Sequence, residues 1–443
     1  MRRSFYLAMK SKNIGIIHYQ VGHTDGVSLE IEKWQCVFEE MGHHVHLCAG
    51  DLGSAEGTLI PEMYHHLPDA KVLAYNTFKE LKDFDELGYS AELERQVALL
   101  TEKFREFVVD REIDVLIAQN VWCVGASLGV AVALEKIRQE FDLPAIAHHH
   151  DFYWERGDDQ TLTCEAAVEV AESYLPPTHP KIQHVVINSL AQKALKERKN
   201  LDARIIPNIF DFDAPAWAKD EYNKDFREAI GLDEDDWLIL QATRIVERKG
   251  IELAIDVLAE MGKKRAERIV LVLAGYARDD ASGTYVQRLQ EKADRLNVEL
   301  LFIEDWIDHE RGSANGHKIY SLWDAYVFAD LVSYPSLWEG WGNQFLEAVR
   351  AELPIMLFEY PVYSADIGEK GFDVISLGTE VTGYDEAGLA QVPQALIEQA
   401  VLEVIELLEN DALRERAVKK NIALGREYYS LDTLRKILGE ELS

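Results

Sequence analysis

Short apolar runs alternate with amphipathic segments along the whole chain. In the first half, runs that predict buried strands lie at 13–19, 44–49, 114–120, 144–150, 184–189 and 203–208. Segments with the helical spacing of apolar residues separate them, for example at 91–110 and 126–140. Strands that alternate with helices form a parallel sheet with helices on both faces. The first half therefore predicts an α/β domain built on a Rossmann-like sheet.

The second half repeats this alternation. Its strand-like runs lie at 237–243, 269–275, 300–305, 330–336 and 354–359, between helical patterns that start at Gly250 and span 284–296, 317–328 and 343–352. A chain of 443 residues is too long for one ordinary core, so two domains are expected.

We expect one Rossmann-like domain at 1–206, a second at 207–415, and a helical segment at 416–443 that can pack back on the first. The polar, acidic stretch 207–236 is the expected interdomain linker. Two such domains facing each other form a cleft, and ligands bind beyond the carboxyl ends of the strands.

Charge limits the kinds of partner. The chain has 78 acidic and 46 basic residues and a formal net charge of −32, and both halves are acidic. Binding to nucleic acid or to an anionic bilayer requires a basic surface, so neither is expected as a partner. No run approaches the roughly 18 apolar residues of a membrane span, so membrane insertion is not expected either.

The N-terminus and the cysteines indicate the compartment. The N-terminal segment 1–13 has only a five-residue apolar stretch between basic residues, so no signal peptide is expected. The four cysteines contain no Cys-x-x-Cys pair and fall mostly in apolar runs, which is typical of reduced thiols. We therefore expect a cytoplasmic protein.

The segment 339–348, EGWGNQFLEA, is the strongest candidate for chemistry. Glu339 and Glu347 flank Gly340 and Gly342, directly after a predicted strand. A glycine loop lets backbone N–H groups approach a ligand, and the helix that follows offers its positive end to phosphate. Carboxylates accept hydrogen bonds from sugar hydroxyls. In isolation these acids are equally typical of a solvated helix, but the combination suits a sugar nucleotide.

Two cations follow the first strand of the second domain. Arg244 and Lys249 lie between a predicted strand and a predicted helix, where both side chains reach the expected cleft. Their natural task is to neutralise a diphosphate, because a leaving nucleoside diphosphate gains negative charge. The alternative is a pair of surface cations in a loop.

The run His148, His149, His150, Asp151 ends a strand of the first domain. Neighbouring strand residues point to opposite faces, so three consecutive imidazoles cannot bind one ion, and no metal site is expected. A histidine at the strand end can instead bind a sugar hydroxyl or a developing charge. Asp151 can orient that histidine or take a proton from the acceptor.

A glycine turn follows the first strand. Gly26 stands before a predicted helix, where backbone donors can approach a phosphate or the acceptor, and His23 and Asp25 can contact the acceptor. A plain turn explains the same residues equally well.

Several motifs together resemble glycosyltransferase family 4, whose members are retaining enzymes with the GT-B fold. The likeness covers most of the chain, is strongest at 184–350, and rests on motifs in the family's order and spacing: INS at 187–189, IPN at 206–208 followed by Asp211, ATRIVERKG at 242–250, LVLAG at 271–275, ADLVSYPS at 329–336 and EGWGNQFLEA at 339–348. The resemblance implies an N-terminal acceptor-binding domain and a C-terminal domain that binds the nucleotide sugar.

The resemblance also implies roles for single residues. It makes Glu339 the carboxylate that holds the donor sugar and Glu347 the one that binds the ribose. Arg244 and Lys249 become the diphosphate clamp. The donor sugar is expected against the loop Gly340, Trp341, Gly342 and Asn343, although Trp341 and Asn343 depart from the commonest form of that loop.

The acceptor side matches the family less closely. His150 resembles the family's cleft histidine, and the neighbouring His149 stays an alternative. Gly26 matches the N-terminal glycine loop only in part, because the usual tandem glycine reads Asp25-Gly26 here.

The function implied is transfer of a hexose, glucose or mannose, from a UDP-, GDP- or ADP-sugar to a hydroxyl of a small soluble acceptor, with retention, as in compatible-solute synthesis. No Asp-x-Asp triplet lies in a plausible donor loop, so we expect neither a metal requirement nor a tightly bound cofactor. Three alternatives remain: a sugar-nucleotide epimerase of the same fold, a phosphorylase with pyridoxal phosphate, and a non-catalytic sugar-nucleotide-binding protein. The oligomeric state, the base and the acceptor stay open.

Overall fold

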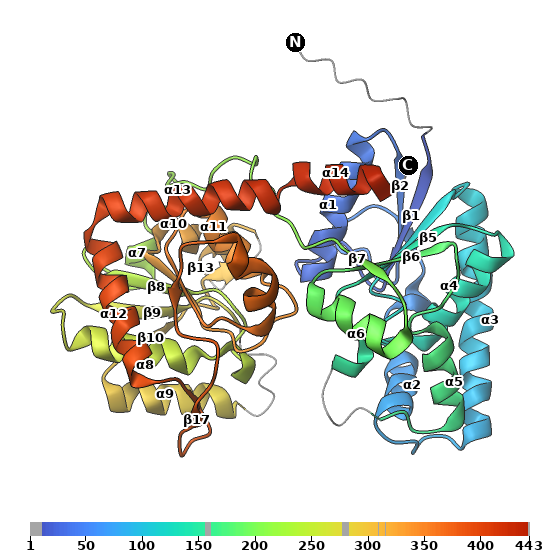
Figure 1. Ribbon diagram of the computed structural model, residues 1–443, viewed down its shortest axis with the longest axis horizontal. Helices are drawn as coiled ribbons and strands as arrows, with labels where there is room; N and C mark the ends of the chain where they lie inside the picture. The colour runs from blue at the N-terminus through green and yellow to red at the C-terminus, as the bar shows by residue number, and fades with distance from the viewer. Residues whose placement is uncertain (1–10, 156–160, 277–282, 309, 315, 442–443) are drawn as a thin grey trace, which may run out of the picture. The chain divides into compact units, whose positions relative to one another are not determined.

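The computed structural model describes residues 11–155, 161–276, 283–308, 310–314 and 316–441. The chain divides into two compact units: unit 1 contains residues 1–209 and 431–443, and unit 2 contains residues 210–430 (Figure 1). Residues 1–10, which carry most of the segment without a signal-peptide pattern, lie outside the described residues.

Unit 1 contains a parallel sheet with the strand order β3-β2-β1-β4-β5-β6-β7. The strands are β1 (Asn13–His18), β2 (His44–Ala49), β3 (Thr58–Leu59), β4 (Val115–Gln119), β5 (Ala145–His149), β6 (Ile182–Val186) and β7 (Ala203–Ile205). The central strands β4 and β5 are buried along their whole length, as their continuous apolar runs predict.

Helices cover both faces of this sheet. They are α1 (Gly26–Glu40), α2 (Pro68–Phe78), α3 (Glu86–Asp110), α4 (Leu128–Glu140), α5 (Glu165–Tyr174), α6 (Ser189–Lys199) and α14 (Leu431–Glu441). One core contains the apolar sides of α3, α4 and α5. The other contains Trp34 of α1 together with Leu434 and Leu438 of α14, all fully buried. The α/β class expected for this half is confirmed.

Unit 2 has a six-stranded sheet with the order β10-β9-β8-β14-β15-β16, also parallel. The strands are β8 (Trp237–Gln241), β9 (Ile269–Leu273), β10 (Glu299–Phe302), β14 (Leu331–Tyr334), β15 (Ile355–Leu357) and β16 (Ile375–Ser376). The helices are α7 (Phe226–Ala229), α8 (Ile251–Gly262), α9 (Thr284–Leu296), α10 (Leu322–Phe328), α11 (Asn343–Arg350), α12 (Gln394–Glu409) and α13 (Asp411–Tyr428). A short antiparallel pair, β17 (Gly383–Tyr384) and β18 (Ala390–Gln391), completes the unit.

The helix expected at 317–328 is wrong in its first part. Residues 317–321 form β13 (His317–Ser321), which pairs with β11 (Ile307–Asp308) and β12 (Gly312–Ala314) in a small separate sheet. The helix α10 starts only after Ser321, whose side chain and Asp324 form a capping box. Apolar residues continue from β13 through the turn into α10, so the sequence pattern does not show where the strand ends and the helix begins.

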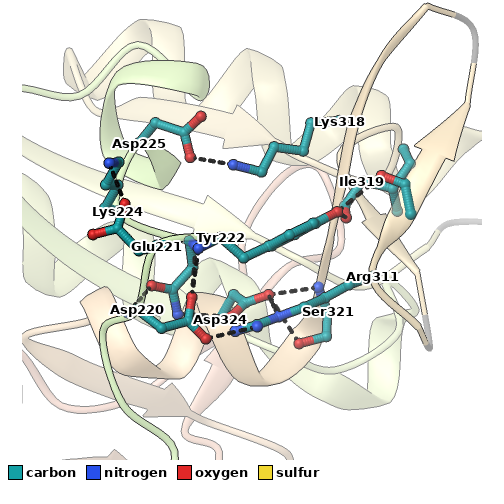
Figure 2. A network of polar contacts seen from close by, with 12 residues as sticks. Asp220, Glu221, Tyr222, Lys224, Asp225, Arg311, Lys318, Ile319, Ser321 and Asp324 are labelled. Carbon is teal, nitrogen blue, oxygen red and sulfur yellow. Dashed lines mark hydrogen bonds and ion pairs between the residues drawn. The ribbon is translucent and has the colours of Figure 1, made fainter.

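The stretch expected as a linker, 207–236, belongs mostly to unit 2. Figure 2 shows that Asp220 accepts a hydrogen bond from Arg311 at 2.7 Å and that Lys318 donates to Asp225 at 2.6 Å. The hydroxyl of Tyr222 donates to the main-chain oxygen of Ile319 at 2.6 Å. The polar residues that suggested an exposed linker therefore bind this stretch to the small sheet.

The segment expected at 416–443 is divided between the units. Its first part lies within α13, where Gly425 packs against Phe212 of unit 2. Its last part, from Leu431, belongs to unit 1 as α14. The apolar stripe of α14 is buried against α1, which explains the division.

Each large sheet has one point where the strand order reverses. In unit 1 it lies between β1 and β4, and in unit 2 between β8 and β14. In open α/β sheets, ligands bind beyond the carboxyl ends of the strands at such a point. Ligand-binding and catalytic residues are therefore expected in the loops after these four strands.

Candidate active site

In unit 2, Glu339 lies in the loop after β14 and is only 9% exposed. Lys249, from the loop after β8, donates a short hydrogen bond to Oε1 of Glu339. Arg248 donates from Nη1 to Oε2 at 2.9 Å. Burial alone would raise the pKa of Glu339, but the two cations outweigh burial and hold it below its usual value. Glu339 is therefore ionised at neutral pH.

The two loops are held together by their backbones. The N–H of Leu337 donates to the main-chain oxygen of Arg248 at 2.8 Å. Gly250 has a φ of +57°, and a Cβ there would lie 2.4 Å from the carbonyl oxygen of Pro335. A glycine is required at this close approach, and it brings Lys249 to Glu339.

The glycine loop itself is held by a tyrosine. Tyr360 donates from its hydroxyl to the main-chain oxygen of Trp341 at 2.7 Å. Gly342 precedes α11 with a φ of +142°, and a Cβ there would lie 2.1 Å from that hydroxyl. Trp341 is buried, whereas Gly340 and Asn343 are half-buried. These contacts therefore hold the glycine loop in position at the end of the sheet.

Glu347 lies on α11 and is half-buried. The hydroxyl of Tyr326 donates to its Oε2 at 2.8 Å. Burial, and then the negative charge of Glu347, raise the pKa of Tyr326 well above its usual value, so this hydroxyl keeps its proton. The bond orients the carboxylate from the side of α10.

The two cations predicted to bind the diphosphate differ in burial. Lys249 is buried against Glu339, while Arg244 is exposed in the loop after β8. The charge of Arg244 acts on Lys249 and helps to lower its pKa, although burial is the main cause. Arg248 was not singled out from the sequence. Its position directly before Lys249, in the same strand-to-helix loop, was the available signal.

In unit 1, the three consecutive histidines separate as strand alternation requires. His148 is fully buried and stacks on Trp34, with ring centroids 4.5 Å apart. His149 is also buried, and its Nε2 lies 3.0 Å from Nδ1 of His184 on the neighbouring strand β6. His149 therefore lies within the core, whereas His150 directly follows β5 at the carboxyl end of the sheet.

His150 and Asp151 are held by Gln119, the last residue of β4, and by Asn120, which follows it. Nε2 of His150 lies 3.1 Å from Oε1 of Gln119. Oδ1 of Asn120 accepts hydrogen bonds from the backbone N–H groups of His150 and Asp151, at 3.1 and 3.3 Å. The amide of Asn120 also donates to the carboxylate of Asp151 at 2.7 Å. Neither Gln119 nor Asn120 was singled out from the sequence.

The glycine turn after β1 is largely a helix start. Asp25 is the N-cap of α1 and accepts hydrogen bonds from the N–H groups of Val27 and Ser28, both at 3.1 Å. Gly26 is the exposed first residue of this helix. His23 is half-buried, with Nε2 3.3 Å from a carboxylate oxygen of Asp51. Burial raises the pKa of Asp25, but hydrogen bonds from the side chains of Ser28 and Gln20, and then from the backbone of Ser28, outweigh burial and lower it.

Because several histidines are buried, we expect the stability of the fold to decrease at acid pH. Burial lowers the pKa of His150 to about 3 and that of His184 to about 4, while unfolded histidine titrates near 6.5. Below pH 6.5 the unfolded chain binds more protons, so stability is complete above that pH and is lost as the pH falls towards 4. We expect the melting temperature to drop between pH 7.5 and 5.5, as measured by circular dichroism.

A variant isolates the contribution of one histidine. His184→Gln removes one such group, and its melting temperature should drop less over the same interval than that of the wild type. The exposed His44 serves as the matched control, because His44→Gln should leave the pH-dependent drop unchanged. An equal drop in His184→Gln and the wild type would contradict this explanation.

Comparisons with known proteins agree with this architecture. The family model described as "Glycosyl transferases group 1" matches residues 223–423. The chain is 38% identical over 442 residues to mannosylglucosylglycerate synthase from Petrotoga mobilis, covering 96% of this chain and 99% of that protein. It is 34% identical over 451 residues to the Thermotoga maritima protein of the same name, covering 97% and 99%.

The chain belongs to the group 1 glycosyltransferases. Among solved structures, this glycosyltransferase is similar to one from Rickettsia africae, with a TM-score of 0.62, 12% identity and 98% of each chain covered. It is also similar to WaaG, a glycosyltransferase involved in lipopolysaccharide biosynthesis, with a TM-score of 0.59, 14% identity, and 97% and 99% covered. At these identities the likeness shows the fold alone, which is GT-B.

Two negative findings apply to the described part of this glycosyltransferase. Within those residues no helix is long and apolar enough to cross a membrane. In the same part of the chain, no three or more His, Cys, Asp or Glu side chains are grouped so that they could hold a metal ion.

Proposed function

We propose that this glycosyltransferase transfers a mannosyl group from a nucleoside diphosphate mannose to a hydroxyl of glucosylglycerate, with retention of anomeric configuration. The relatives that match over nearly the full chain are named for a product with mannosyl, glucosyl and glycerate parts. The observation that carries a transferase site is Glu339, ionised between Lys249 and Arg248 beside the glycine loop. Such a product is a small soluble solute, in agreement with the strongly acidic chain.

The donor is assigned to unit 2. Glu339 accepts hydrogen bonds from hydroxyls of the donor sugar, and Arg244 and Lys249 neutralise the diphosphate. Glu347, oriented by Tyr326, accepts hydrogen bonds from the ribose hydroxyls. The backbone of the loop at 340–343, made rigid by Tyr360, lines the sugar.

The acceptor is assigned to unit 1. His150 stands at the end of β5 as a neutral imidazole, because burial lowers its pKa to about 3. It therefore acts by hydrogen bonding to a hydroxyl rather than as a charged acid. Asp151, fixed by Asn120, supports the acceptor side. Asp25 caps α1, and His149 lies in the core. Both therefore act by positioning neighbouring residues.

The reaction exchanges one bond at the anomeric carbon. The acceptor oxygen bonds to this carbon on the face from which the diphosphate departs, and the carbon–oxygen bond to the diphosphate breaks. The proton of the acceptor hydroxyl passes to the departing phosphate oxygen. Positioning and stabilisation of the diphosphate charge supply most of the rate.

The test is a matrix of donors and acceptors. GDP-, UDP- and ADP-mannose and the corresponding glucose donors are each incubated with glucosylglycerate, glycerate, glucose and glucose phosphate. We expect a product with the mass of mannosylglucosylglycerate and, by NMR, the anomeric configuration of the donor. Donor isomerisation without acceptor would support an epimerase instead. Donor binding without any product would support a non-catalytic binding protein.

We predict that turnover does not require a divalent metal. The donor loop pairs the diphosphate with Arg244 and Lys249, and no Asp-x-Asp triplet lies in it. Excess EDTA should therefore leave the initial rate unchanged within about twofold, because the two cations supply the charge that a metal otherwise would. Loss of activity with EDTA, followed by recovery with magnesium or manganese, would contradict this prediction.

A further inference from the structure

His18 is the last residue of β1 and stands at the point where the strand order of unit 1 reverses. It is only 6% exposed, and its Nδ1 lies 2.6 Å from the main-chain oxygen of Gln119 on β4. A carbonyl oxygen can only accept, so Nδ1 carries the hydrogen and donates it. In the neutral ring, Nε2 is then left with a lone pair.

The ring is neutral at the pH of a normal assay. Burial lowers the pKa of His18, although the bond to Gln119 and the charges of Asp25 and Asp151 oppose this effect. Within the described residues, Nε2 of His18 has no hydrogen-bond partner. The buried side-chain atoms without a partner do not include Nε2 of His18, so a ligand can reach its lone pair.

The surroundings indicate what kind of group would meet this atom. Gln119 orients two imidazoles at once, because its main-chain oxygen holds His18 and its side-chain oxygen lies 3.1 Å from His150. The carboxylates of Asp25 and Asp151 are close enough to act on His18 electrostatically. Two nearby negative charges disfavour an anionic group there. A hydroxyl, which donates a hydrogen to a lone pair, fits the site.

We propose that His18 is an acceptor-binding residue whose Nε2 accepts a hydrogen bond from a hydroxyl of the sugar acceptor. This inference rests on the proposed function, and it adds a residue that the sequence motifs did not indicate. The competing explanation is structural: the ring only joins β1 to β4 through Nδ1. The two explanations use different nitrogen atoms, so they can be separated.

The test uses two amide substitutions that each retain one nitrogen position. Asparagine places its amide nitrogen near Nδ1, so His18→Asn keeps the bond to Gln119 and loses the Nε2 acceptor. Glutamine reaches the Nε2 position with an amide oxygen and loses the bond to Gln119. Each variant is assayed as the full chain for acceptor KM, donor KM and melting temperature, with His44→Asn as an exposed control.

We expect His18→Asn to lower kcat/KM for the acceptor by about three- to tenfold, the value of one hydrogen bond, with donor KM and melting temperature unchanged. His18→Gln should melt earlier but have an acceptor KM closer to that of the wild type. An unchanged kcat/KM for the acceptor in His18→Asn would overturn the proposal, as would an increase confined to donor KM.

Failure of the proposed function is recognisable separately. If the wild type transfers no sugar to any acceptor in the matrix, the proposed function and this inference both fail. If the wild type transfers sugar and His18→Asn behaves like it, only the inference fails.

Discussion

We expect Glu339→Gln to lower turnover by about a thousandfold and to leave the protein folded. The substitution keeps the shape of the side chain but removes the charge that Lys249 and Arg248 hold in place. Loss of one preorganised electrostatic contact in an active site typically costs a factor of 10² to 10³. The measurement is kcat from initial rates of nucleoside diphosphate release, together with circular dichroism at 25 °C.

Glu299→Gln is the matched control, because Glu299 lies in the same unit and pairs with Arg268 where β10 begins, at the amino end of the sheet. It should retain kcat within about twofold, as a substitution away from the site does. Similar rates for Glu339→Gln and the wild type would remove Glu339 from the proposed site. A loss of helical signal would instead indicate that the carboxylate serves mainly to pair the buried Lys249.

We expect Gly342→Ala to lower turnover by about a hundredfold. The new Cβ would lie 2.1 Å from the hydroxyl of Tyr360, at a φ of +142° that residues with a side chain rarely adopt. The loop must move to relieve this contact, and a displacement of about 1 Å near reacting groups can cost about a hundredfold in rate. Steady-state kinetics should show the loss in kcat, with KM for the donor also raised.

The hydroxyl of Tyr360 offers a way to test the cause. In the double variant Gly342→Ala/Tyr360→Phe the nearest atom to the new Cβ becomes the ring carbon at 3.3 Å, so part of the activity should return. Gly371→Ala is the control for backbone strain, because Gly371 also has a positive φ, +84°, but nothing within 4 Å of its Cβ. Equal rates for Gly342→Ala and Gly371→Ala would contradict the steric explanation.

The extent to which the sequence predicted the fold depended on the length of each pattern. Long elements were predicted closely: the helix expected at 284–296 is α9 (Thr284–Leu296), and the run at 13–19 is β1 (Asn13–His18). Short elements were not, because β11 and β12 contain two and three residues and carry no periodicity. The stretch 207–236 was assigned to a linker because its polar partners are distant in sequence.

The sequence likewise indicated only part of the candidate site. Motif order along the chain indicated the loops after β8 and β14, and the structure places Lys249 and Glu339 from these two loops in contact. The roles of these residues stay predictions until the variants are assayed. Arg248, although it stands next to Lys249, and His18 were not singled out from the sequence. The partner of each lies 91 or 101 residues away along the chain, so only the fold shows the contact.

Two parallel α/β units, and the strand-to-helix loops with candidate chemical groups, follow from the amino-acid sequence alone. Hydrophobic periodicity and loop composition are local properties, so a single chain suffices to show them. The three-dimensional fold is needed to show which groups meet: Glu339 between two cations, His149 in the core, and His18 oriented by Gln119. Those contacts depend on strand order and on the approach of loops at glycines, which join segments far apart in sequence.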